Sequence, residues 1–194
     1  MLIKDESQIL EDYEKGWDER WERGWGSYYW RLHPFYRAVE QYLHSSPVLD
    51  IGCGAGFLAA RVFPNLAWYT GVDISGKAVE LGEMLFPGAK FLRHDAEHKP
   101  LPFKDNSFAT VVCSELIEHL EDYSLLLSEI QRVSRAYMVI TVPVNMHGCG
   151  HVWPVWGYDD VIEQFSQLGK ILVVHIDLEH NFYLLWIRKK HLRG

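Results

Sequence analysis

The sequence predicts an α/β fold with a doubly wound, largely parallel sheet and helices on both faces. Three observations support this. Short apolar runs rich in β-branched residues alternate with stretches of helical periodicity. The run beginning at Val48 ends in a glycine-rich turn, the strand–loop–helix arrangement that offers backbone N–H groups to a nucleotide-like ligand. The last two apolar runs, 171–176 and 182–188, are joined by a turn so short that they must be antiparallel.

The composition limits the class of protein. The 194 residues, 48% hydrophobic and 23% charged, suit one domain with a sizeable core. The net charge of −7 argues against a general attraction to nucleic acid and favours neutral, cationic or small partners. The three cysteines, Cys53, Cys113 and Cys149, are odd in number and widely spaced, which argues against a disulfide framework. With no apolar run of membrane-spanning length and no signal-like N-terminus, we expect a cytoplasmic monomer or homodimer without a membrane partner.

The first 44 residues differ from the rest in being rich in aromatic side chains. Trp17, Trp21 and Trp25 are spaced so that a helix would place them on one face, although nearby glycines interrupt that helix. Two interpretations stay open: packing against the outside of the helical layer, or a lid with an aromatic wall suited to a sulfonium or ammonium group. We therefore divide the chain into a helical lid, residues 1–44, and a ligand-binding domain, residues 45–194.

The remaining elements follow in order. After the glycine turn a helix is expected at 57–63, and Pro64 then breaks the chain. Ser75 is placed to cap a helix that Pro87 and Gly88 end. The continuous apolar run 108–114 is typical of a buried parallel strand. Further strands are predicted at 67–73, 90–93 and 137–142, and further helices at 35–43, 122–134 and 159–168.

The ligand chemistry is indicated by acidic residues near the glycine turn. Gly52, Gly54 and Gly56 follow a G-x-G-x-G spacing, which is not the G-x-G-x-x-G pattern of dinucleotide sites. Asp50, at the end of the strand, would repel a diphosphate and attract an amino group or a sulfonium cation. Asp73 ends the next strand, about 20 residues on, where an acid accepts hydrogen bonds from ribose hydroxyls.

Taken together, these motifs resemble the class I S-adenosylmethionine-dependent methyltransferases over residues 40–190. Asp95-Ala96 follows the third strand, and the stretch 111–122 is similar to the fourth motif of the small-molecule branch, which includes the ubiquinone-biosynthesis enzymes. The resemblance implies a Rossmann-like seven-stranded sheet of order 3-2-1-4-5-7-6 with the last strand antiparallel, and S-adenosyl-L-methionine as cofactor. One departure is the turn at 133–137, which lacks the Lys-Pro-Gly-Gly-like pattern of the family.

The resemblance also implies roles for individual residues. The loop glycines would let the backbone approach the methionine part of the cofactor, with Asp50 near its ammonium group. Asp73 would bind the ribose hydroxyls, and Ile74 would pack on the adenine. Asp95 would accept from the adenine amine, while Ala96 donates its N–H. The predicted cofactor-binding residues are Asp50, Gly52, Cys53, Gly54, Gly56, Asp73, Ile74, Asp95, Ala96, Cys113 and Ser114.

Methyl transfer from a sulfonium requires an aligned acceptor and the exclusion of water. A general base is needed only when the nucleophile carries a proton. Glu115 and His119 are the first candidates, because they follow the fourth strand on the open side of the sheet, and His151 in the late loop is the next. The predicted acceptor is a small molecule, and methylation of oxygen, nitrogen or carbon stays open.

Other functions were weighed against this one. Glu115-x-x-Glu118-His119 matches the metal-binding motif of small-RNA 3′-terminal ribose methyltransferases, with His147 or His151 as a further ligand. Metal-free relatives share that motif and the chain is acidic, so we predict no metal. A non-catalytic S-adenosylmethionine-binding module is a second alternative. An NAD-dependent dehydrogenase fits Asp73 but neither Asp50 nor the glycine spacing.

Overall fold

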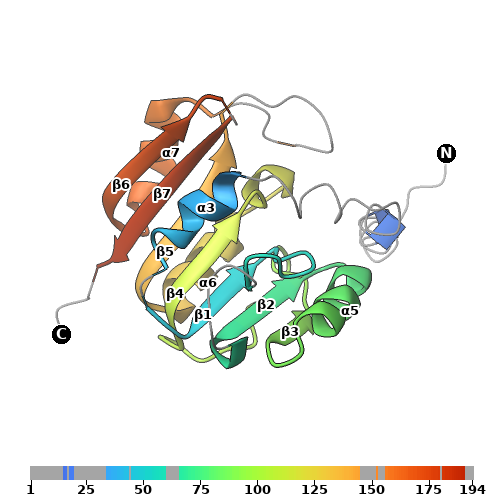
Figure 1. Cartoon of the computed structure of the whole chain (residues 1–194). Helices are drawn as coiled ribbons and strands as arrows, with labels where there is room; N and C mark the ends of the chain where they lie inside the picture. The colour runs from blue at the N-terminus through green and yellow to red at the C-terminus, as the bar shows by residue number, and fades with distance from the viewer. Residues whose placement is uncertain are drawn as a thin grey trace.

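The computed structural model describes residues 15–16, 18–19, 34–43, 45–59, 66–144, 152, 156–179 and 181–190. Within them lies a seven-stranded sheet of order β3-β2-β1-β4-β5-β7-β6 (Figure 1). Its strands are β1 (Val48–Ile51), β2 (Tyr69–Asp73), β3 (Lys90–Arg93), β4 (Phe108–Ser114), β5 (Ser134–Pro143), β6 (Gly169–Asp177) and β7 (Phe182–Lys189).

The pairing of the strands confirms the predicted sheet. β1 lies between β2 and β4 and is parallel to both, while β3 and β5 extend the sheet in parallel on either side. β7 is antiparallel to both β5 and β6. In the register, Ile51 lies beside Val72 and Cys113, so the loops that follow β1, β2 and β4 emerge along the same edge of the sheet.

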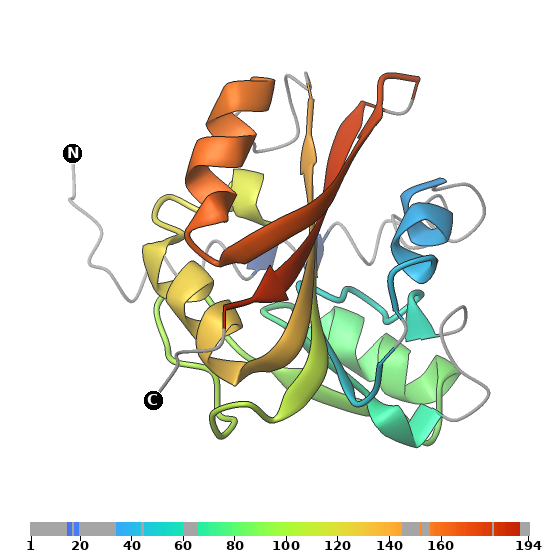
Figure 2. The same ribbon diagram turned by 90° about the vertical axis from the view of Figure 1, so that its left-hand side faces the viewer.

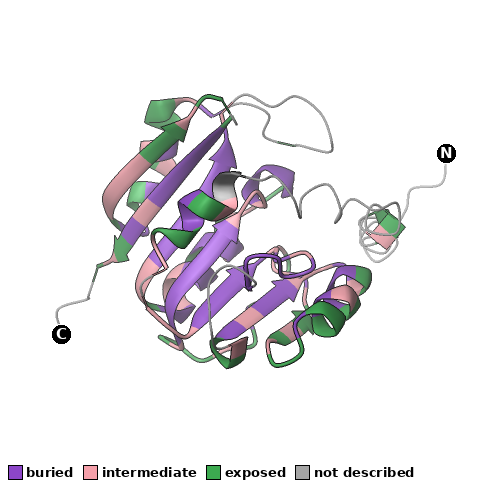
Figure 3. Cartoon of the chain, viewed as in Figure 1, coloured by how far each residue is buried: buried purple, intermediate pink, exposed green. Residues whose placement is uncertain are grey.

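Helices cover both faces of the sheet (Figure 2). α6 (Ser124–Val133) and α7 (Tyr158–Ser166) lie on one face, and α3 (Pro34–Glu40) and α5 (Gly76–Leu85) lie on the other. Alternate residues of a strand therefore enter different cores: Val111 and Cys113 of β4 pack with α6 and α7, whereas Val112 packs with residues of α3. The central strands are buried on both faces, as Figure 3 shows, which explains why β4 reads as a continuous apolar run.

Several predicted boundaries shift. The first residues of the strand expected at 67–73 form a 3₁₀ turn, η1 (Leu66–Trp68), so β2 begins at Tyr69. Phe57 and Leu58 lie in a turn, Ala59 is helical, and residues 60–65 of the expected helix lie outside the described residues. The chain has no Lys-Pro-Gly-Gly-like turn at 133–137 because helix and strand follow each other directly. α6 ends at Val133, and Ser134, with φ −69° and ψ 135°, already starts β5.

The start of α5 is capped as predicted. Ser75 Oγ accepts a hydrogen bond of 3.1 Å from the N–H of Ala78. The same hydroxyl donates to Asp18 Oδ1 at 2.5 Å, and the N–H of Lys77 also donates to Asp18 at 3.1 Å. A carboxylate from the N-terminal region thus supports the positive end of α5.

The contacts of Asp18 do not test whether residues 1–44 form a lid. Trp17, Trp21 and Trp25 lie outside the described residues. Among the residues that are described, no helix has the length and apolar character that a membrane span requires.

Candidate active site

The glycine loop after β1 is fixed by Asp73 at the end of β2. Gly52, Gly54 and Gly56 have φ values of +70°, +53° and +72°, a left-handed conformation that side chains disfavour. The N–H of Gly54 donates to Asp73 Oδ2 at 2.8 Å, and the N–H of Ser75 donates to Oδ1 at 2.9 Å. One carboxylate therefore ties the glycine loop to the start of α5.

Asp50 lies beneath this loop and is only 4% exposed. Tyr69 donates its hydroxyl hydrogen to Asp50 Oδ2 at 2.6 Å. Burial raises the pKa of Asp50 to about 7, with the Tyr69 hydrogen bond opposing the shift and the charge of Asp73 adding to it. The carboxyl is thus held in place by the fold, and a cation beside it would favour its ionised form. Its contact with the cofactor ammonium stays a prediction.

Asp95 caps the turn that follows β3. Its carboxyl is buried, and Oδ1 accepts hydrogen bonds of 3.1 Å from the N–H groups of both Glu97 and His98. Oδ2 lies 3.1 Å from Nδ1 of the His98 ring. Ala96 packs against the core, and the carbonyl of Ile74 accepts from Arg93 Nε. The turn is therefore rigid at the place where recognition of adenine is predicted, and the contacts of these residues with adenine stay predictions.

The two described cysteines lie in the core, and their contact with the cofactor stays a prediction. Cys53 and Cys113 are free and buried, and burial raises the pKa of both thiols well above the ordinary value. They are accordingly protonated at neutral pH and are poor nucleophiles. Cys53 also fills the space beside Gly71, where an added Cβ would lie 2.6 Å from its sulfur.

Two glutamates follow β4. Glu115 has a φ of +50°, and Thr141 of β5 holds it in two ways: Thr141 Oγ1 donates to Glu115 Oε1 at 2.9 Å and accepts from the Glu115 N–H at 3.1 Å. Burial raises the pKa of Glu115 to about 7, with the Thr141 hydrogen bond opposing the shift. A carboxyl with that pKa exchanges a proton readily at neutral pH, as a general base must.

Glu118 and His119 belong to the 3₁₀ turn η2 (Ile117–His119) and are both buried. His119 Nε2 lies 3.9 Å from Glu118 Oε1. Burial, and then the charge of Glu115, raise the pKa of Glu118 well above the ordinary value. His119 is only 7% exposed, and its role as a base stays a prediction.

The predicted residues largely converge at one edge of the sheet. A Cβ added to Gly52 would lie 3.0 Å from Leu116, so the turn after β4 packs on the glycine loop. His151, the third candidate base, and His147 and Cys149 lie outside the described residues. In the part of the chain that is described, no group of His, Cys, Asp or Glu side chains has the arrangement of a metal site.

Four residues of the site were not singled out as site residues by sequence reasoning. Tyr69 and Thr141 act through side-chain hydrogen bonds to residues 19 and 26 positions away, which only the strand pairing brings together. His98 contacts a residue three positions earlier, a local signal that could have been found. Glu118 had been weighed only as a metal ligand.

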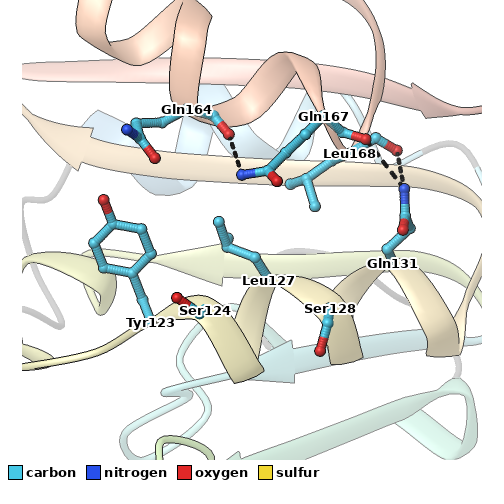
Figure 4. Close-up of a pocket in the computed structure, with 8 residues that line it drawn as sticks. All are labelled: Tyr123, Ser124, Leu127, Ser128, Gln131, Gln164, Gln167 and Leu168. Atoms are coloured by element: carbon cyan, nitrogen blue, oxygen red, sulfur yellow. Dashed lines mark hydrogen bonds between the residues drawn. The ribbon is translucent and has the colours of Figure 1, made fainter.

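A separate hollow of about 200 Å³ lies between α6 and α7 (Figure 4). Gln131 lies at the edge of the hollow, and its Nε2 donates to the carbonyls of Gln167 and Leu168 at 3.2 Å each. None of the predicted site residues lines this hollow, whose walls are Tyr123, Ser124, Leu127, Ser128, Gln131, Gln164, Gln167 and Leu168. It is therefore a surface feature between helices and not the candidate active site.

The strand order and the acidic loops at one edge define the class: the fold is that of a class I S-adenosylmethionine-dependent methyltransferase. Residues 49–137, just under half of the chain, match the family model described as "Methyltransferase domain".

Curated relatives match about half of the chain. A phthiotriol/phenolphthiotriol dimycocerosates methyltransferase of Mycobacterium ulcerans is 35% identical over 105 residues, covering 51% of this chain and 38% of the relative. A ubiquinone/menaquinone biosynthesis C-methyltransferase of Desulfotalea psychrophila is 35% identical over 89 residues, covering 44% and 36% respectively. The matches thus span well under half the length of these relatives.

Solved structures match almost the whole fold at low identity. A chain from the complex between the Haloferax volcanii Trm112 methyltransferase activator and a methyltransferase gives a TM-score of 0.71 at 18% identity, covering 95% of this chain and 99% of the other. The magnesium protoporphyrin IX methyltransferase of Synechocystis, solved with bound SAH, gives 0.69 at 15% identity, covering 96% and 100%. At these identities the likeness concerns the fold.

Proposed function

We propose that this protein is an S-adenosylmethionine-dependent methyltransferase that acts on a small-molecule acceptor. The observation that carries the proposal is the Asp73 carboxylate, which bridges the glycine loop and α5 inside the matched methyltransferase domain. Relatives named for C-methylation in ubiquinone/menaquinone biosynthesis and for a magnesium protoporphyrin support a small organic acceptor.

The acidic side chains near the glycine loop suit S-adenosylmethionine better than a phosphate-bearing cofactor. Asp50, Asp73 and Asp95 bring carboxyls to one edge of the sheet, where they would repel phosphate and attract an ammonium or a sulfonium. Gly54, with no side chain and φ +53°, leaves room for a ligand to approach the backbone. When bound, S-adenosyl-L-methionine supplies a methyl group that its sulfonium already activates.

The remaining chemistry falls to the residues after β4. Glu115, oriented by Thr141 and with a pKa raised to about 7 by burial, can take a proton from an acceptor that carries O–H or N–H. Ser114 adds a buried hydroxyl without a hydrogen-bond partner among the described residues. His119 and His151 stay proposals as further bases. We propose no role for a metal.

The test is transfer of labelled methyl from S-adenosylmethionine into fractionated cell extract. We expect label in the small-molecule fraction, accompanied by S-adenosylhomocysteine and unaffected by a chelator. Label in RNA that is lost on chelation would instead establish the metal-assisted ribose methyltransferase. Cofactor binding without transfer to any fraction would establish a non-catalytic module.

We also propose a cytoplasmic location and a monomeric or homodimeric state. Free buried thiols at Cys53 and Cys113 support a reducing compartment. Cell fractionation and light scattering of the purified chain test the two proposals, and a secreted or higher oligomeric protein would contradict them.

A further inference from the structure

The carboxyl of Glu118 is buried without a hydrogen bond to the described residues. The residue is 0% exposed, and neither side-chain oxygen has a hydrogen-bond partner among the described residues. Buried polar groups are nearly always paired, because leaving one unpaired costs free energy. Its backbone, by contrast, is engaged, since the Glu118 carbonyl accepts from the N–H of Val152 at 2.7 Å. The main chain of η2 is thus satisfied, whereas the side chain is not.

Glu118 belongs to a cluster with unused hydrogen-bonding capacity. Glu115 is its electrostatic neighbour and is fixed on one side by Thr141. The Ser114 hydroxyl is also buried and without a partner in the described part of the chain. Two carboxyls and a hydroxyl therefore collect within five residues, 114–118, and the His119 imidazole lies beside them, with Nε2 3.9 Å from Glu118 Oε1.

This cluster adjoins the cofactor cradle. Leu116, between the two glutamates, packs where a Cβ on Gly52 would lie. Ser114 pairs with Thr141 in the register of β4 and β5, which places the cluster at the same edge of the sheet as the glycine loop. A methyl acceptor must lie beside the cofactor, so the cluster is placed to contact it.

Resting on the proposed function, we propose that Glu115 and Glu118 form the subsite for the polar group of the acceptor. The subsite selects acceptors that donate hydrogen bonds, amines and hydroxyls, and excludes carboxylates and phosphates. Two neighbouring buried carboxyls do not both ionise without a compensating charge, so one of them stays protonated in the ligand-free site. A hydrogen-bond donor on the methyl acceptor pairs with the carboxyl oxygens of Glu118, and an ammonium group lets both carboxyls ionise. An anion would add a third negative charge to a buried site.

The test compares three molecules that share one ring: benzylamine, benzyl alcohol and benzoate. Each is added to the protein saturated with S-adenosylhomocysteine, and binding is read from the rise of the unfolding temperature with concentration. We expect benzylamine to bind best, benzyl alcohol next and benzoate not at all. Equal binding of all three, a preference for benzoate, or no binding of any of them would overturn the subsite.

The variant Glu118→Gln removes the ionisable group and keeps its shape. We expect at least tenfold weaker benzylamine binding, with S-adenosylhomocysteine affinity unchanged. Glu83→Gln, on the exposed face of α5, is the matched control and should leave both unchanged. An unaltered benzylamine affinity in Glu118→Gln would contradict the proposal. Failure of the wild-type chain to bind S-adenosylhomocysteine would instead count against the proposed function.

An infrared measurement needs no variant. At neutral pH the protonated carboxyl of this pair should add to the C=O band that Asp50, with a pKa of about 7, also contributes, and benzylamine should reduce the band as both glutamates ionise. A wild-type spectrum without a protonated carboxyl band, or one that benzylamine leaves unchanged, would contradict the proposal even if Glu118→Gln failed to fold.

Discussion

The two halves of the site, the loops after β1 to β3 and the turn after β4, differ in how their buried carboxyls are hydrogen-bonded. Around the glycine loop, Asp50, Asp73 and Asp95 each accept hydrogen bonds from the protein itself. After β4, Glu118 accepts none from the described residues, and Glu115 is held on one oxygen by Thr141. The carboxyls of the first half are hydrogen-bonded without a ligand, whereas the Glu118 carboxyl of the second half is not.

The difference separates positioning from recognition. A carboxylate held by backbone N–H groups is preorganised, so a ligand meets it in place and the protein gives up little conformational entropy. An unpaired carboxyl, by contrast, destabilises the protein until something binds it.

Replacing Asp73 should affect ligand binding most. Asp73→Ala removes acceptors for the N–H groups of Gly54 and Ser75, together with the predicted ribose contact. Because hydrogen bonds to charged groups contribute about 1.5–3 kcal/mol each, we expect S-adenosylhomocysteine affinity to fall on the order of 100-fold. Titration calorimetry measures it, with Glu83→Ala on exposed α5 as control. An unchanged affinity would remove Asp73 from the site.

Gly56→Ala tests the conformation of the loop. The new Cβ would lie 2.4 Å from Phe91 Cζ at a φ of +72°, so both strain and overlap oppose it. We expect unfolding in urea to require about 2–4 kcal/mol less free energy. Gly76→Ala is the matched control, because its Cβ meets Arg93 at an ordinary 3.6 Å. Equal stability of the two variants would refute the tight packing of the loop.

The protonation of Asp50 predicts a pH dependence. Its pKa rises from 3.8 unfolded to about 7 folded, so the folded state keeps a proton that the unfolded state loses. This contribution to stability is full below pH 3.8 and is lost as the pH rises to about 7. Asp50→Asn abolishes it.

The measurement is urea unfolding of the ligand-free chain at two pH values. Relative to Asp50→Asn, the wild-type stability should fall by about 2 kcal/mol between pH ~5 and ~7. Exposed Asp159→Asn should follow the wild type. Parallel pH profiles for the wild type and Asp50→Asn would show that Asp50 is ionised in the fold.

A change at the hollow between α6 and α7 should affect stability least and leave ligand binding unchanged. Gln131→Ala removes hydrogen bonds to the carbonyls of Gln167 and Leu168 at the edge of that hollow. We expect about 0.5–1.5 kcal/mol lower stability and no change in S-adenosylhomocysteine binding. A loss of ligand affinity would move the site to this hollow.

The sequence predicts the parts of the fold that depend on local pattern. Continuous apolar runs locate β4 and β5 because parallel strands are buried on both faces. Ser75 is recognisable as a cap because capping joins residues three apart. The order of the sheet came from the family resemblance, since periodicity alone does not fix which strands are neighbours.

What the sequence did not reveal depends on contacts across the sheet. Tyr69 reaches Asp50 only because β2 lies beside β1, and Thr141 reaches Glu115 only because β5 lies beside β4. Glu118 is buried in the 3₁₀ turn η2, a stretch for which the sequence pattern predicted no helix or strand. Predictions for His151 and the tryptophan lid concern residues outside the described part of the chain.

A crystal structure with S-adenosylhomocysteine bound tests the proposed cofactor site. We expect the ribose hydroxyls to contact the Asp73 carboxylate and the sulfur to lie between the glycine loop and the turn at Ser114 and Glu115. S-adenosylhomocysteine bound between α6 and α7, or bound at the edge of the sheet without contact to Asp73, would contradict it.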